Sequence, residues 1–142
     1  MANVPSDVTD LKRAFGAHRQ LEGNLQVSRR SRVMALFYAA ECGLKCVLMA
    51  SANLTNVMDL KPIFKTKYGK SDLHDIEALC IEASILPSDV GATPSDFVVN
   101  GATFASYRIH EAARYGVKLP DIYLVAVENW LRNIATQVSL RI

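Results

Sequence analysis

The sequence contains few of the residues that interrupt regular structure, with 7 glycines and 5 prolines among 142 residues. It also lacks any sustained two-residue alternation of β-branched residues, the pattern that indicates a half-buried strand. No internal repeat or low-complexity segment is present. With 50% hydrophobic and 21% charged residues, the composition excludes global disorder. These features predict one helical domain over residues 1–142.

Cysteine is scarce as well, and the 3 cysteines are an odd number. They therefore give no disulfide framework, and a reducing cytoplasm is the expected location. A structural zinc site needs four ligands at recognisable spacings, but neither C-x-x-C nor H-x-x-x-H occurs. Cys42 and Cys46 are interpreted as small core residues, and neither a metal nor another cofactor is expected.

The motifs of several function classes are missing. There is no serine, histidine and acid arrangement for acyl transfer and no glycine-rich phosphate loop. A net charge of +2 is too small by itself to indicate nucleic acid. The first residues, MANVPSDVTDLKRAFG, show no basic segment followed by an apolar one, so no signal peptide is expected.

One apolar run, residues 33–52, has the length of a membrane span. Glu41 and Lys45 lie at its middle, and each would cost about 2.5–3.5 kcal/mol there on insertion scales. We therefore expect a helix buried in a soluble bundle and no membrane span.

Helical periodicity and capping residues predict five helices. Ser28 and Ser71 are expected N-caps, and Gly116 is an expected C-terminal stop. Residues 53–70 are predicted to be irregular, and LPSDVGATPSD is predicted to be the main loop. The expected helices run from 6 or 7 to 22, from 28 to 52, from 72 to 84, from 95 or 103 to 115, and from 120 to 139. The predicted fold is all-α, a five-helix antiparallel up-and-down bundle.

The helix expected at 28–52 has two apolar faces. At 100° per residue, a stripe of large residues and a face of small residues both result, so other elements should contact this helix from two sides. It is therefore the expected central element. The large stripe holds Val33, Leu36, Phe37, Ala40, Leu44, Val47 and Leu48, and the small face holds Ala35, Ala39, Cys42, Gly43 and Cys46.

Glu41 and Lys45 form an i,i+4 pair on the flank of this helix. If they are exposed, they are a solvated pair of little consequence. If they are buried, each needs further partners, because an unpaired charge is costly in a core. The possible partners lie in SDLHDIEAL and YRIHEAARYG, so the pair belongs either to a structural network or to a binding site. These candidates are His74, Asp75, Arg108, His110, Glu111 and Arg114.

Two short segments are basic. Arg29, Arg30 and Arg32 lie in SRRSR at the start of the helix expected at 28–52, where they oppose the helix dipole. Lys65 and Lys67 lie in KPIFKTKYGK, which interleaves lysines with aromatic residues. The two segments indicate either a surface for RNA or a nucleotide, or solvated positions without a partner.

Three segments together resemble the HEPN superfamily, named for higher eukaryote and prokaryote nucleotide binding. ALFYAAECGLKCVLM resembles its second-helix pattern of alanine, an acidic residue and lysine. SDLHDIEAL resembles its His-Asp-hydrophobic signature at the start of the third helix. HEAARYGVKLPDIYLVAVENWLRNI resembles its Ala-Arg-Tyr-Pro turn into the last helix, with glycine in place of the usual proline. The resemblance covers about residues 33–135.

The resemblance implies a helical bundle that dimerises and has polar residues at defined positions. Members include ribonucleases, toxins, phage-defence components and nucleotide-binding partners of nucleotidyltransferases. The implied ligand-binding residues are Glu41, Lys45, His74, Asp75, Arg114 and Tyr115.

The ribonuclease branch of the superfamily uses an Arg-x(4–6)-His motif late in the domain, and this sequence has none there. Arg108 and His110 are only two residues apart. Arg13 and His18 have the right spacing, but they lie in the first helix.

The leading prediction is therefore a cytoplasmic HEPN-like homodimer that binds a nucleotide, RNA or a protein partner and is not catalytic alone. It could belong to a toxin–antitoxin or phage-defence system, with a nucleotidyltransferase as partner. One alternative is a metal-independent ribonuclease that uses His110 or His18 with a nearby arginine. The other is a structural adaptor subunit of a larger complex.

Overall fold

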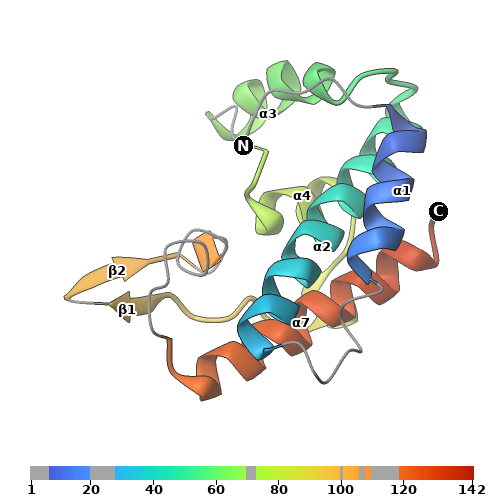
Figure 1. Ribbon diagram of the computed structural model, residues 1–142. Coiled ribbons are helices and arrows are strands. Elements are labelled where there is room, and N and C mark those ends of the chain that lie inside the picture. The colour runs from blue at the N-terminus through green and yellow to red at the C-terminus, as the bar shows by residue number, and fades with distance from the viewer. Residues whose placement is uncertain (1–6, 20–27, 70–72, 100, 106–107, 110–118) are drawn as a thin grey trace.

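The longest helix, α2 (Arg29–Ala52), forms the centre of the described structure. The computed structural model describes residues 7–19, 28–69, 73–99, 101–105, 108–109 and 119–142 (Figure 1). Ser28 caps α2, since its side chain accepts a hydrogen bond from the backbone N–H of Ser31 at 3.2 Å. The helix ends at Asn53, whose left-handed φ of 55° closes the C-terminus. The predicted bounds of this helix are confirmed.

Two helices from the ends of the sequence pack against α2. They are α1 (Val8–Arg19) and α7 (Asp121–Ser139), which share the most extensive helix contacts with it (Figure 1). At Gly43 on the small face, an added Cβ would lie 2.5 Å from Val138 Cγ1 and 2.9 Å from Phe15 Cδ1. The small face therefore lets α1 and α7 approach closely. Val33, Leu36, Phe37, Ala40 and Leu44 of the large stripe are also buried, so the central role predicted for this helix is confirmed.

Several short helices occupy segments that were predicted to be irregular. They are η1 (Val57–Asp59), α3 (Leu60–Tyr68) and α5 (Pro87–Val90). Pro62 is compatible with α3 because it lies in the first turn, where its missing N–H would have no partner within the helix. Leu60 and Phe64, four residues apart, are buried, which supplies the apolar face. The prediction of an irregular 53–70 stretch was wrong for these residues.

Helix α4 (Ile76–Glu82) begins later than the predicted residue 72. Leu73 and His74 lie in a turn, and Asp75 caps the helix. Ser71, the predicted cap, lies outside the described residues. An aspartate at position 75 competes effectively as a cap because its short side chain reaches the N–H of Ala78, three residues on.

A hairpin replaces the first part of the predicted fourth helix. Strands β1 (Phe97–Val99) and β2 (Ala102–Phe104) pair antiparallel, and the hairpin extends away from the helices (Figure 1). The sequence carries the signal for it, because Asn-Gly at 100–101 separates two β-prone segments. Gly101 has a φ of 79°, which favours glycine. The expectation of no sheet was wrong here, although the described chain is mostly helical.

The remaining helix predictions concern the first, fourth and last helices. Helix α7 agrees with the predicted 120–139. Helix α1 ends at Arg19 within the described residues, and positions 20–22 of the predicted first helix lie outside them. Residues 110–115 of the predicted fourth helix also lie outside them.

Helix α2 is long and apolar enough to cross a membrane by length and composition alone. Its most apolar 18-residue window has a mean hydropathy of 1.6, and 67% of that window is buried inside the structure. The core helix of a soluble protein has the same properties, so the absence of a membrane stays a prediction.

Candidate functional site

Glu41 and Lys45 lie one turn apart on the central helix α2, and both are buried. Glu41 is 1% exposed, and Lys45 Nζ lies 3.6 Å from Glu41 Oε2. The side chain of Lys45 is only 11% exposed. The pair is therefore not the solvated surface pair that was one of its two sequence interpretations.

His74 supplies the second partner of Glu41 from a different element. It lies in the turn before α4, and its Nδ1 contacts Glu41 Oε1. The two oxygens of one carboxylate thus face a lysine from the same helix and a histidine 33 positions further along the chain. The His74 side chain is 20% exposed, which makes it the most exposed of the three side chains, whereas that of Glu41 is 2% exposed.

The burial of Glu41 makes this cluster energetically important. A carboxylate in a core is tolerated only when it is paired or hydrogen-bonded. Removing one partner of a buried ion pair costs about 3–5 kcal/mol, mainly because the other charge stays buried without compensation. The cluster, defined as Glu41, Lys45 and His74, is therefore held together strongly whether or not it binds a ligand.

The other predicted ligand-binding residues have different outcomes. Asp75 is 8% exposed, and its Oδ1 accepts the backbone N–H of Ala78 at 3.2 Å. Its carboxylate thus caps α4. Arg114 and Tyr115 lie outside the described residues.

The cysteines beside the cluster are packing residues, as predicted. Cys46 and Cys80 are buried, and Cys42 packs against the core. Burial first, and the charge of Glu41 second, raise the pKa of the Cys42 thiol to about 11. Burial likewise raises the pKa of Cys80 to about 12. At neutral pH these sulfurs are protonated thiols, which are poor nucleophiles and poor metal ligands.

The predicted basic surface at the start of α2 is partly buried. Arg32 is only 9% exposed, and its Nε donates to Glu128 Oε1 of α7 at 3.2 Å. Arg29 Nε lies 3.4 Å from Glu128 Oε2, within ion-pair distance although without hydrogen-bond geometry. Arg132 Nη2 lies 3.4 Å from Glu128 Oε1. The assignment of Arg32 to a basic surface was wrong, because positions 29 and 32 share the helix face that meets α7.

Glu128 is a buried charged residue that the sequence analysis did not single out. It is 6% exposed and receives all three of these arginines. The available signal was an acidic residue inside the predominantly apolar segment YLVAVENWL. A buried glutamate in such a segment needs positively charged partners, and the arginines of SRRSR were the obvious candidates. This second cluster ties the start of α2 to α7.

The two lysines of the other basic segment lie in the last turn of α3. Lys65 is exposed. Lys67 pairs with Glu82 of α4, with Nζ 3.0 Å from Oε1, and the hydroxyl of Tyr68 donates to the same oxygen at 2.8 Å. Burial first, and then Glu82, raise the pKa of Tyr68 to about 12. Both lysines are therefore exposed, as predicted for this segment, although Lys67 pairs with Glu82.

Among the described residues, the candidate catalytic residues form no recognisable catalytic arrangement. Arg13 is 74% exposed at its side chain and pairs with Asp10 at 3.5 Å. Arg108 lies in a short helical turn, and His110 lies outside the described residues, as does the side chain of His18. The ribonuclease alternative therefore stays a prediction.

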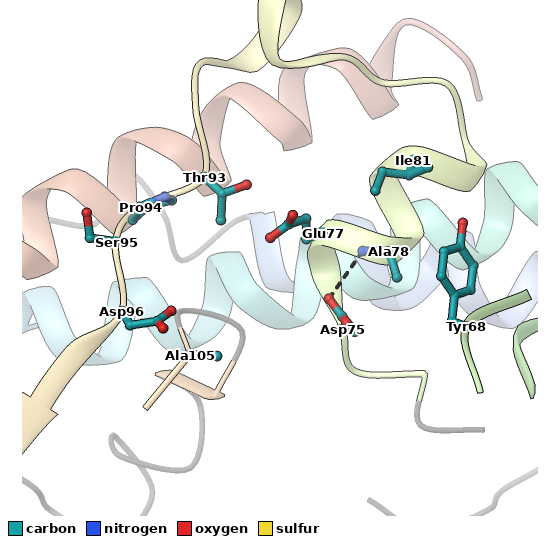
Figure 2. Close-up of a pocket in the computed structure, with 10 residues that line it drawn as sticks. All are labelled: Tyr68, Asp75, Glu77, Ala78, Ile81, Thr93, Pro94, Ser95, Asp96 and Ala105. Atoms are coloured by element: carbon teal, nitrogen blue, oxygen red, sulfur yellow. Dashed lines mark hydrogen bonds between the residues drawn. The ribbon is translucent and has the colours of Figure 1, made fainter. Parts of the chain in front are cut away.

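A surface pocket of about 630 Å³ lies beside the start of α4 (Figure 2). Its wall is formed by α3, α4 and the segment 93–96, and Asp75, Glu77 and Asp96 give it an acidic character. Neither Glu41 nor His74 lines it. Its lining residues are Tyr68, Asp75, Glu77, Ala78, Ile81, Thr93, Pro94, Ser95, Asp96 and Ala105.

Within the described ranges, no three histidine, cysteine, aspartate or glutamate side chains are placed to hold a metal ion. Neither a protein-family model, nor a curated protein, nor a solved structure matches this chain, so the HEPN resemblance stays a prediction.

Proposed function

We propose that this protein is a non-catalytic helical binding domain that takes the phosphate groups of a nucleotide at Lys45 and His74. Glu41 is the buried anchor of this site and not a ligand contact. The ammonium of Lys45 has three N–H donors, and an imidazole can donate from either nitrogen. Lys45 can therefore hold Glu41 and still present donors to an anionic group, whereas an imidazole does both only when each of its two nitrogens carries a proton.

One observation carries the proposal. The single carboxylate of Glu41, 1% exposed, contacts both Lys45 and His74, whose side chains are 11% and 20% exposed. The three N–H donors of Lys45 exceed what its contact with Glu41 uses, so they can also bind a phosphate oxygen. The site is preorganised, since α2 and the turn before α4 fix both side chains before a ligand arrives.

The wider biological setting follows the sequence resemblance. We propose a HEPN-like bundle that works as a cytoplasmic homodimer, in which Arg114 and Tyr115 complete the nucleotide site. The biological partner would be a nucleotidyltransferase or another component of a toxin–antitoxin or defence system. The position of Glu41, Lys45 and His74 in the family pattern supports this setting, and their contact in space agrees with it.

The test is a thermal-shift and calorimetric titration with ATP, GTP and inorganic triphosphate. Wild-type protein should be stabilised, by about 2.7 kcal/mol at a ligand concentration 100 times the dissociation constant. Lys45→Met keeps the length and the apolar stem of the side chain but removes its charge, so it should lose the shift.

Lys67→Met is the matched control, because Lys67 also pairs with a glutamate but lies 55% exposed and away from the cluster. It should keep the full nucleotide shift. If wild-type protein shows no shift with any of the three ligands, the cluster is a structural network and the proposal is wrong.

A further inference from the structure

We propose that the pocket between α3, α4 and residues 93–96 binds an aliphatic diamine, whose two ammonium groups are held by Glu77 and Asp96. The pocket has a volume of about 630 Å³, which lies within the range of about 300–1,000 Å³ found for small-molecule sites. Because Lys45 and His74 do not line it, this is a second site. The proposal does not depend on the proposed nucleotide site.

Two carboxylates line the pocket without a partner. Glu77 lies in the first turn of α4, and Asp96 is the residue before β1. Figure 2 shows them on opposite sides of the pocket, with each carboxylate directed into the space between α4 and residues 93–96. Neither carboxylate forms a hydrogen bond or an ion pair with another described residue. A pocket lined by charges of one sign concentrates ions of the opposite sign, so this pocket favours a cationic ligand.

The placement of the acidic residues favours an organic cation over a metal ion. The third of them, Asp75, uses its carboxylate to cap α4. A metal ion needs several ligands around one point, and among the described residues no three acidic, histidine or cysteine side chains are placed to hold one. The acidic residues are therefore spread around the pocket and do not surround a single position.

The rest of the lining suits a hydrocarbon stem. Ala78, Ile81 and Pro94 give the pocket apolar surface. Ile81 is 58% exposed, so an aliphatic chain that covers it removes apolar area from water. An aliphatic diamine combines this stem with a cation at each end. A binding site of this kind has mostly apolar walls and a few polar groups that fix the orientation of the ligand.

The test is an NMR titration of the full-length, 15N-labelled protein with 1,5-diaminopentane at an ionic strength of about 0.15 M. Saturable shifts are expected at residues 75–81 and 93–97. Glu77→Gln and Asp96→Asn should each weaken binding about threefold, the effect of one solvent-exposed ion pair, and the double variant about tenfold. Pentylamine has only one ammonium group and should bind the wild-type protein about threefold more weakly than the diamine.

Asp59→Asn is the matched control, because Asp59 is an exposed carboxylate of η1 that does not line the pocket. This variant should bind the diamine as tightly as the wild-type protein does. The absence of saturable shifts in the wild-type protein would overturn the proposal, and so would equal affinities of the wild-type protein and the double variant. Equal binding of Mg²⁺ at the same signals would also overturn it, because the site would then take any dication.

Discussion

Replacement of Gly43 by alanine tests whether α1 and α7 really meet at the small face of α2. The new methyl group would lie 2.5 Å from Val138 Cγ1 and 2.9 Å from Phe15 Cδ1. Neither neighbour moves easily, because Val138 is β-branched and the Phe15 ring is buried. The helices must therefore separate, or one side chain must leave its preferred rotamer.

Gly16→Ala in α1 supplies the reference for this change. An added Cβ at Gly16 has no atom within 4 Å, so this variant gains only the helix propensity of alanine, about 1 kcal/mol. Gly43→Ala makes the same gain within α2 but adds an overpacking cost of about 1–3 kcal/mol. Gly16→Ala should thus be more stable than wild type, and Gly43→Ala should range from near wild type to about 2 kcal/mol less stable. The difference between the two variants isolates the packing cost.

Urea unfolding followed by circular dichroism at 222 nm measures both variants directly. The expected difference of about 1–3 kcal/mol corresponds to a difference in Tm of about 4 °C for each kcal/mol in a domain of this size. Equal stability of the two variants would refute the reasoning. It would mean that α2 has room for a methyl group at Gly43, so that α1 and α7 do not pack closely there.

Three further predictions concern residues outside this contact. Arg32→Ala should lower the free energy of unfolding by about 1–3 kcal/mol, since it leaves the buried Glu128 with one donor fewer, whereas Lys65→Ala on the surface should stay within about 0.5 kcal/mol of wild type in the same urea titration. Native Cys42 should react with iodoacetamide at pH 8 about a hundredfold more slowly than a thiol with the unperturbed pKa of 9.0, because its pKa is about 11, and it should react at the ordinary rate in urea; mass spectrometry of the alkylated peptide measures both rates. Burial raises the pKa of Glu82, but the hydrogen bonds and charge that it meets from α3 outweigh burial and leave that pKa lowered. The lowered pKa stabilises the fold above the pKa of the unfolded state, and this stabilisation is lost as pH falls through the folded pKa. The stability advantage of wild type over Glu82→Gln should therefore shrink on acidification, and an advantage that is independent of pH would contradict this.

The features that follow from local pattern could be predicted from the sequence. The bounds of α2 depend on Ser28 as its cap and on an apolar composition all round, and both are visible without tertiary information. The same holds for Gly43, since a glycine among small residues on one helix face indicates a close neighbour. Helix α7 was predictable for similar reasons, from Pro120 and Asp121 at its start.

Features that depend on competition between local signals were predicted less well. The hairpin at 97–104 was hidden because isolated strands of three residues give almost no periodic signal, although Asn-Gly marked the turn. Helix α4 starts at Ile76 because Asp75 is the cap used, and nothing local excluded an earlier start. Arg32 looked like a surface residue because its partner, Glu128, lies 96 positions away.

The carboxylates of Glu41 and Glu128 show why one partner of each polar cluster was predictable and the other was not. Glu41 pairs with Lys45, and Glu128 pairs with Arg132, each at i,i+4 on its own helix. These local partners follow from helix geometry alone. Each carboxylate also takes a partner from another element, His74 for the first and Arg32 for the second, and this choice depends on how the elements pack.

The chemical identity of the distant partner separates the two clusters in function. A guanidinium keeps its proton under all ordinary conditions, and Arg32 uses it to pair with Glu128 and join α2 to α7. An imidazole has two ring nitrogens that can each donate or accept a hydrogen bond, so His74 suits a wider range of partners than a guanidinium does. A binding site needs side chains that can exchange a hydrogen-bond partner within the protein for one on the ligand. An ion pair that only holds two helices together does not need this. This difference, more than burial, favours the cluster of Glu41, Lys45 and His74 as the functional one.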